Sequence, residues 1–134
     1  MKGLLERVEQ ATGVMGRTEA RKIADLSCWQ KDSQEYELLV MALMGYIQAV
    51  GAALSLVERG LPGWRIVMER NGSDGFVRVF LSPDLNRMEP GERHGALYGD
   101  VRSHTTTLPL AILAALLRAL IAQDAAAASE AGHG

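Results

Sequence analysis

The sequence predicts an α+β protein in which helices precede a three-stranded antiparallel β-meander, and a C-terminal helix then packs on the sheet. Apolar residues recur with the three-four spacing of a helix over 33–60 and 108–122, but alternate with polar residues over 64–70 and 76–82. The 134 residues suffice for one domain. We divide it into short helices at 1–32, a core α-β-β-β-α unit at 33–122 and an alanine-rich flexible tail at 123–134. An alternative is that the alanines of this tail extend the last helix before it frays.

The N-terminal segment predicts two short amphipathic helices. Residues 3–13 place Leu4 and Val8 on one face, and Gly13 is a suitable C-terminal cap. Residues 17–29 predict the second helix, with Thr18 as its N-cap. Ile23 and Leu26 are expected to anchor this second helix in the core.

Residues 33–60 are the longest helical segment, and Ser33 is a good N-cap for it. Its apolar face is broad, so much of the helix is expected to be buried. An interior glycine weakens a helix by about 1 kcal/mol relative to alanine, so a break near Gly45 is an alternative that leaves a main helix over 46–59. Gly60 and Pro62 end the helix.

Three strands follow this helix. The first two, 64–70 and 76–82, flank residues 71–75, whose Asn and Gly tolerate the positive φ that a hairpin requires. If the two strands pair in order, Arg65, Arg78 and Phe80 lie on one face of the hairpin. A third, weaker strand covers 96–104 after the loop 83–95. Both faces carry apolar residues, so we expect cover on both sides of the sheet.

The last helix, 108–122, follows Thr107 as N-cap and has Pro109 in its first turn. It is apolar on most of its circumference, which indicates burial in a core or a subunit interface. It carries Arg118 and falls short of the roughly 20 residues of a membrane span. Because one small sheet cannot cover so much apolar helix, we expect a homo-oligomer. The interface residues that this interpretation selects are Ala53, Leu113 and Leu117.

The composition limits the function classes. With 48% hydrophobic and 22% charged residues the chain is globular, and its net charge of -2 argues against a dedicated nucleic-acid binder. Cys28 is the only cysteine, which excludes an internal disulfide and predicts a buried structural thiol in a reducing cytoplasm. The N-terminus is too charged for a signal peptide. We therefore expect a cytoplasmic protein without membrane contact.

Two stretches of the core unit share a pattern with a known family. Residues 49–64, AVGAALSLVERGLPGW, are an alanine-rich helix that leads through Gly63 into Trp64, the start of the first strand. Residues 105–122, TTTLPLAILAALLRALIA, open on Thr107 and Pro109 and continue in leucine and alanine. Together with the hairpin between them, they resemble the phage ABA-sandwich domain family over residues 46–122. The resemblance implies a small bacteriophage or prophage protein, and it implies no set of catalytic residues.

Catalytic chemistry finds little support. A cysteine nucleophile needs a neighbouring base, and no histidine lies within 60 residues of Cys28. The chain contains no nucleophile elbow, P-loop or dinucleotide fingerprint. His94, His104 and His133 lack the spacing of zinc ligands. We therefore expect a protein that is not an enzyme and uses no cofactor or metal.

Arginines and aromatic residues on the sheet are the best candidates for a binding site. Guanidinium groups suit phosphates, and aromatic rings suit a stacked base. The candidate ligand-binding residues are Arg65, Arg78, Phe80, Tyr98, Arg102 and His104. They converge only if the third strand presents its arginine on the face that carries Arg78. The alternative is that the arginines lie along a half-buried sheet and pair with carboxylates such as Glu69 and Asp100.

Two functions are consistent with this pattern. In the first, which takes its phage setting and its counter-defence role from the resemblance, a small accessory protein binds and sequesters an anionic nucleotide-like signal in an oligomer. In the second, the protein is an interaction module that binds a phage or host protein through apolar helix faces and uses no small ligand. An enzyme is the third interpretation, and a cleft with a strongly perturbed histidine or carboxylate would favour it.

Overall fold

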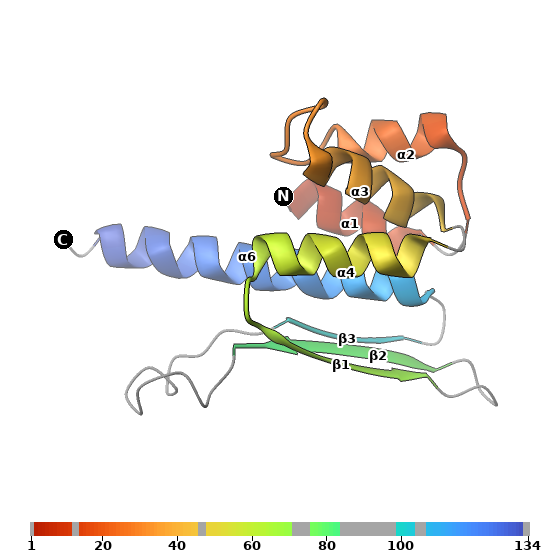
Figure 1. The fold of residues 1–134 in the computed structure, drawn as a ribbon. Coiled ribbons are helices and arrows are strands. Elements are labelled where there is room, and N and C mark those ends of the chain that lie inside the picture. The colour runs from red at the N-terminus through yellow and green to blue at the C-terminus, as the bar shows by residue number, and fades with distance from the viewer. Residues whose placement is uncertain are drawn as a thin grey trace.

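The predicted element order is confirmed by a computed structural model of the chain, which describes residues 2–11, 14–45, 48–70, 76–83, 99–103 and 107–132. Helices come first, an antiparallel meander follows, and a long C-terminal helix packs on the sheet (Figure 1). The elements are α1 (Lys2–Gln10), α2 (Arg17–Ala24), α3 (Gln34–Met44), α4 (Ala49–Gly60), β1 (Arg65–Arg70), β2 (Val77–Ser82), β3 (Gly99–Ser103) and α6 (Leu108–Gly132).

Caps explain where several helices begin and end. The Ser33 hydroxyl accepts a hydrogen bond from the Tyr36 backbone N–H at 3.2 Å, as expected of an N-cap, and α3 starts directly after it. Gly45 has a φ of 73°, a left-handed conformation that ends α3. The alternative of a break near Gly45 is therefore confirmed. The Thr18 cap is wrong, because α2 begins at Arg17 after Gly16 and has no side-chain cap.

The second helix is also shorter than predicted, since α2 ends at Ala24. Ile23 is buried, together with Ala20 and Ala24, but Leu26 lies beyond the helix and is 46% exposed. Of the two predicted anchors only Ile23 therefore packs in the core. Cys28 follows in the same connection and is exposed, which corrects the expectation of a buried thiol. The early end of α2 is the physical reason, because the residues after it no longer follow the helical face that points to the core.

The sheet has the strand order β1-β2-β3, and both pairings are antiparallel. β2 is central, and its alternate residues Val77, Val79 and Leu81 are buried. All the described helices lie on the side that these residues face (Figure 1). The prediction of cover on both sides is therefore wrong for the described helices, because the opposite side carries charged side chains among its apolar ones.

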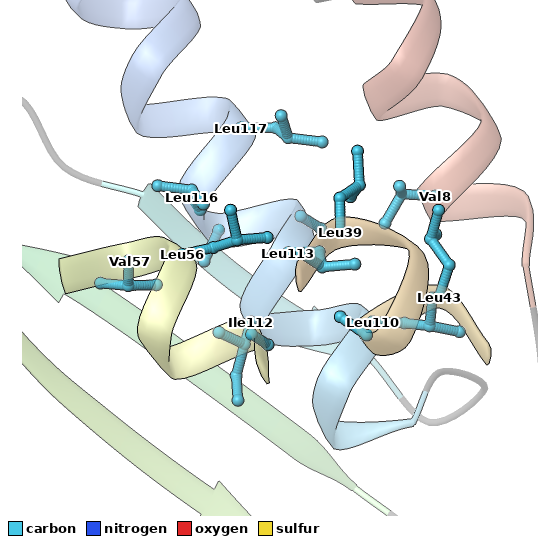
Figure 2. Close-up of a cluster of buried hydrophobic side chains, with 14 of the residues drawn as sticks. Val8, Leu39, Leu43, Leu56, Val57, Leu110, Ile112, Leu113, Leu116 and Leu117 are labelled. Atoms are coloured by element: carbon cyan, nitrogen blue, oxygen red, sulfur yellow. The ribbon is translucent and has the colours of Figure 1, made fainter. Parts of the chain in front are cut away.

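The centre of the core is α6, which contacts α1, α3, α4, β2 and β3. Residues 110–117 are all buried, so the helix is apolar all round because it is surrounded by its own chain. Figure 2 shows Leu113 and Leu117 among side chains from α1, α3 and α4, including Val8, Leu39 and Leu56. Burying one such leucine contributes roughly 1.5–3 kcal/mol.

Two features of α6 bear on the predictions. The helix continues through the alanine-rich segment to Gly132, which agrees with the alternative that the alanines extend the last helix. Its Leu108–Ala125 stretch is, among the described residues, the one helix that is long and apolar enough to cross a membrane. Because 56% of that stretch is buried inside the protein, its place in the core accounts for its apolar character.

One close approach fixes β3 against α6. A Cβ atom added at Gly99 would overlap the backbone carbonyl group of Ala115, which cannot rotate away as a side chain could. Only glycine therefore lets β3 cross the helix at this distance. This contact sets the lateral position of β3 and of the residues that follow Gly99.

Candidate functional site

The strand register decides which candidate residues share a face. Arg78 on β2 lies directly opposite Arg102 on β3 and opposite Glu69 on β1, and Phe80 lies opposite Asp100. Residues directly opposite one another point to the same side of a sheet. The outer face, the side away from the helices, therefore carries Arg65, Val67 and Glu69 from β1, Arg78 and Phe80 from β2, and Asp100 and Arg102 from β3.

Arg78, Arg102 and Asp100 form one charged cluster on this outer face. Asp100 Oδ1 lies 3.6 Å from Arg78 Nε, and Oδ2 of the same carboxylate lies 3.4 Å from Arg102 Nε. The carboxylate thus lies between two guanidinium groups that would otherwise repel each other. The Arg78 and Asp100 side chains are 30% and 28% exposed, so their attraction is screened less than that of a fully exposed pair.

Phe80 completes the cluster. The Arg78 guanidinium carbon lies 5.8 Å from the centre of the Phe80 ring, within cation–π distance. Glu69 lies farther off, with Oε1 at 4.0 Å from Arg78 Nη1. Arg78 therefore lies among an aromatic ring and two carboxylates, which agrees in part with the alternative that the arginines pair with acidic neighbours.

Arg65 does not join this cluster. It lies opposite Ser82, four residues along β2 from Arg78, which corresponds to about 14 Å along the strand. Its side chain is exposed on the same face. The remaining candidates Tyr98 and His104 lie outside the described residues, as do the histidines His94 and His133.

Arg118 is a residue that sequence reasoning missed as part of a site. Its Nη2 donates a hydrogen bond to Glu9 Oε2 at 2.7 Å, and its Nη1 donates to the Asp100 backbone carbonyl. It thereby ties α1 and α6 to the strand that carries Asp100. The signal was a single arginine in an otherwise apolar helix, but only the fold shows what it contacts.

A small cavity lies beside this arginine, between α1, β3 and α6. Its volume is about 130 Å³, and its polar lining residues are Glu9, Arg102, Ser103 and Arg118. Pockets for drug-sized ligands measure roughly 300–1,000 Å³. This cavity is therefore too small to enclose a nucleotide. A larger cavity of about 350 Å³ lies between α1 and α2, away from the sheet, and is lined by residues such as Arg7, Met15 and Glu19.

The buried Tyr36 hydroxyl lies away from the sheet and joins two helices. Tyr36 is buried, and its hydroxyl donates to Asp25 Oδ1 at 2.8 Å, with the Arg21 carbonyl oxygen at 3.3 Å. Burial raises the pKa of the Tyr36 phenol above its ordinary value, and the hydrogen bond to Asp25 raises it further. This contact joins the end of α2 to α3.

The predicted interface residues lie in the core. Ala53, Leu113 and Leu117 are 0%, 1% and 1% exposed within the single chain, so their side chains cannot contact a partner in this structure. The sequence predicted an interface from the large apolar surface of the last helix. In the structure α1, α3 and α4 of the same chain cover that surface. Among the described residues, no group of three or more His, Cys, Asp or Glu side chains could hold a metal ion.

Comparison of the chain with protein-family models, with curated proteins and with solved structures gave no match.

Proposed function

We propose that the protein is a non-enzymatic binding protein, and that the outer face of the sheet binds an anionic, nucleotide-like molecule. The observation that carries this proposal is the register that places Arg78 opposite Arg102 and next to Phe80. Two adjacent guanidinium groups offer planar donors to a phosphate, and a neighbouring ring offers a stacking surface. An incoming phosphate would compete with Asp100 for both arginines.

The proposed setting follows from the resemblance to phage proteins. A cytoplasmic phage or prophage protein that sequesters a nucleotide signal would act in counter-defence by stoichiometric binding without turnover. Because the open face of one chain is not enclosed, binding in an oligomer, in which a second copy enlarges or covers that face, is part of the proposal.

Calorimetric titration with a panel of cyclic nucleotides and ADP-ribose derivatives tests the ligand. We expect Arg102→Ala to weaken binding by about tenfold or more, since a charge-assisted hydrogen bond contributes roughly 1.5–3 kcal/mol. Arg70→Ala is the matched control, because it removes the same charge from an exposed residue. Arg70 lies opposite Val77, on the helix side of the sheet and not on the outer face. Binding should also weaken with salt. The proposal fails if no member of the panel produces heat or a thermal shift.

A second candidate function is the binding of a protein partner on the same face. It is favoured by the two carboxylates, Asp100 and Glu69, which alternate with the arginines and would suit a partner surface that also carries both signs. In that case the nucleotide panel gives no signal. Binding of a protein partner through the apolar faces of α4 and α6 is less favoured, because those faces are buried in the core.

A further inference from the structure

The edge strand β1 is unusually exposed. It lies at one end of the sheet order, and five of its six residues are exposed, including residues that point to the helix side. The helix that covers the sheet, α6, packs on β2 and β3. Val67 and Met68, on opposite faces of β1, are 48% and 41% exposed. Among the described residues only β2 pairs with β1, so β1 presents apolar side chains on both faces and an edge that no described strand covers.

Such an edge can add a further strand. The outward N–H and C=O groups of an edge strand are free to pair with another chain, and proteins usually protect these groups with charges, bulges or cover. β1 does carry charges, at Arg65, Glu69 and Arg70. The arrangement of these charges determines which strand they would accept and which they would repel.

We propose that β1 pairs antiparallel with β1 of a second copy of this chain, about a two-fold axis that passes through Val67. In this register Arg65 lies opposite the second copy's Glu69, and the reciprocal pair forms on the other side of the axis. Val67 lies opposite its own copy at the centre. The outer face of the edge is thus self-complementary, with an apolar centre between two pairs of opposite charge.

The helix side of the strand fits the same register. Ile66 lies opposite the second copy's Met68, so the exposed methionine gains an apolar neighbour. Arg70 lies opposite Trp64, which immediately precedes β1 and is half-buried, and an arginine over an indole ring is favourable. Each exposed apolar residue of β1 therefore has an apolar residue opposite it.

Neighbouring symmetric registers lack this match. A two-fold axis perpendicular to the sheet keeps outer residues opposite outer residues. Each possible axis therefore passes through one residue of β1, and neighbouring registers place it at neighbouring residues. With the axis at Ile66, Arg65 lies opposite Val67; with the axis at Met68, Glu69 lies opposite Val67. An axis at Arg65 or Glu69 places like charges directly opposite each other. Only the axis at Val67 pairs both arginine–glutamate sets.

The result is a continuous six-stranded antiparallel sheet with the outer faces of both copies on one side. This inference rests on the edge of β1 and not on the proposed ligand, so either can fail without the other. Glu69 is available for it, because its side chain is 56% exposed and its contact with Arg78 in the same chain is long, at 4.0 Å.

Charge substitution tests the register. By analytical ultracentrifugation the wild-type protein should form a dimer, and Arg65→Glu should raise the dissociation constant by about tenfold or more, because two attractive pairs become repulsive. Glu69→Arg should act in the same direction. An equal mixture of the two variants should form heterodimers, since each carboxylate then faces an arginine. Native mass spectrometry distinguishes these heterodimers from either homodimer.

A cysteine at the axis gives an independent measurement. Directly opposite residues in an antiparallel pair have Cα atoms about 4.5–5.5 Å apart, which a disulfide can bridge. Val67→Cys in a Cys28→Ser background should therefore form a covalent dimer under mild oxidation. Val14→Cys in the same background places the thiol at an exposed position outside β1, and this matched control should crosslink far more slowly.

The outcomes separate clearly. A wild-type monomer over the whole concentration range of sedimentation overturns the proposal, and so does a dimer that neither variant weakens. Mixing without heterodimer formation overturns the register. Far-UV circular dichroism of Arg65→Glu verifies that the monomer is still folded, which is expected because that side chain is exposed.

Discussion

Replacing Gly99 by alanine should strongly destabilise the protein, although the change adds only one methyl group. The added Cβ would overlap the carbonyl oxygen of Ala115 and approach that residue's carbonyl carbon and Cα. All of these atoms are backbone atoms, so no side chain can rotate away, and β3 or α6 must shift. Overpacking typically costs 1–3 kcal/mol. We expect a loss at the upper end, about 3 kcal/mol or more, which is a large fraction of the 5–15 kcal/mol typical of a domain.

Gly51→Ala is the matched control for this substitution. Gly51 is exposed in α4, and an added Cβ would meet no atom within 4 Å. Because alanine is favoured over glycine in a helix, this change should stabilise the protein by about 0.5–1 kcal/mol. The same chemical change thus has opposite signs at the two positions, which separates the close approach from any general effect of removing a glycine.

Urea unfolding followed by far-UV circular dichroism and tryptophan fluorescence measures both variants. Gly99→Ala should lower the midpoint without a large change in slope, and its thermal midpoint should fall by roughly 10 °C. A free energy of unfolding within about 0.5 kcal/mol of the wild type would contradict the packing of β3 on α6 at Ala115, since surface substitutions have effects of that size.

Four further substitutions test other contacts by the same unfolding assay. Arg118→Ala removes the links to Glu9 and to the Asp100 carbonyl and should cost about 1–2 kcal/mol, whereas Glu9→Gln should cost less than about 0.5 kcal/mol because both partners of that ion pair are 40% exposed. Tyr36→Phe removes the hydrogen bond to Asp25 and should cost about 1 kcal/mol at pH 7. Because the folded-state pKa of Tyr36 is raised, the wild type should also lose stability as the pH rises above about 10, where the unfolded chain ionises, and Tyr36→Phe should lose less. Leu113→Ala should lower the free energy of unfolding by about 2–5 kcal/mol, because it leaves a cavity in the core. A folded monomer of unchanged stability would instead indicate that Leu113 belongs to a subunit interface.

Much of the local structure could be predicted from residue patterns. The period-two alternation of 76–82 already placed Arg78 and Phe80 on one face, because side-chain direction in a strand depends only on odd or even position. That Arg65 shares this face depends on the register of the hairpin, which the structure supplies. Ser33 and Gly45 act locally, so a cap and a break were recognisable in the sequence. The apolar helix 108–122 was also recognisable as buried.

Tertiary structure decided the rest, because the deciding contacts join residues far apart in the chain. The register of β3 depends on its position against α6, and Gly99 permits that position through a contact with Ala115 that no sequence spacing encodes. Arg118 looked like an interruption of an apolar run, yet it joins α1 to β3. The apolar surface of α6 indicated burial but not what covers it, since a partner subunit and the chain's own α1, α3 and α4 satisfy the same hydrophobic pattern.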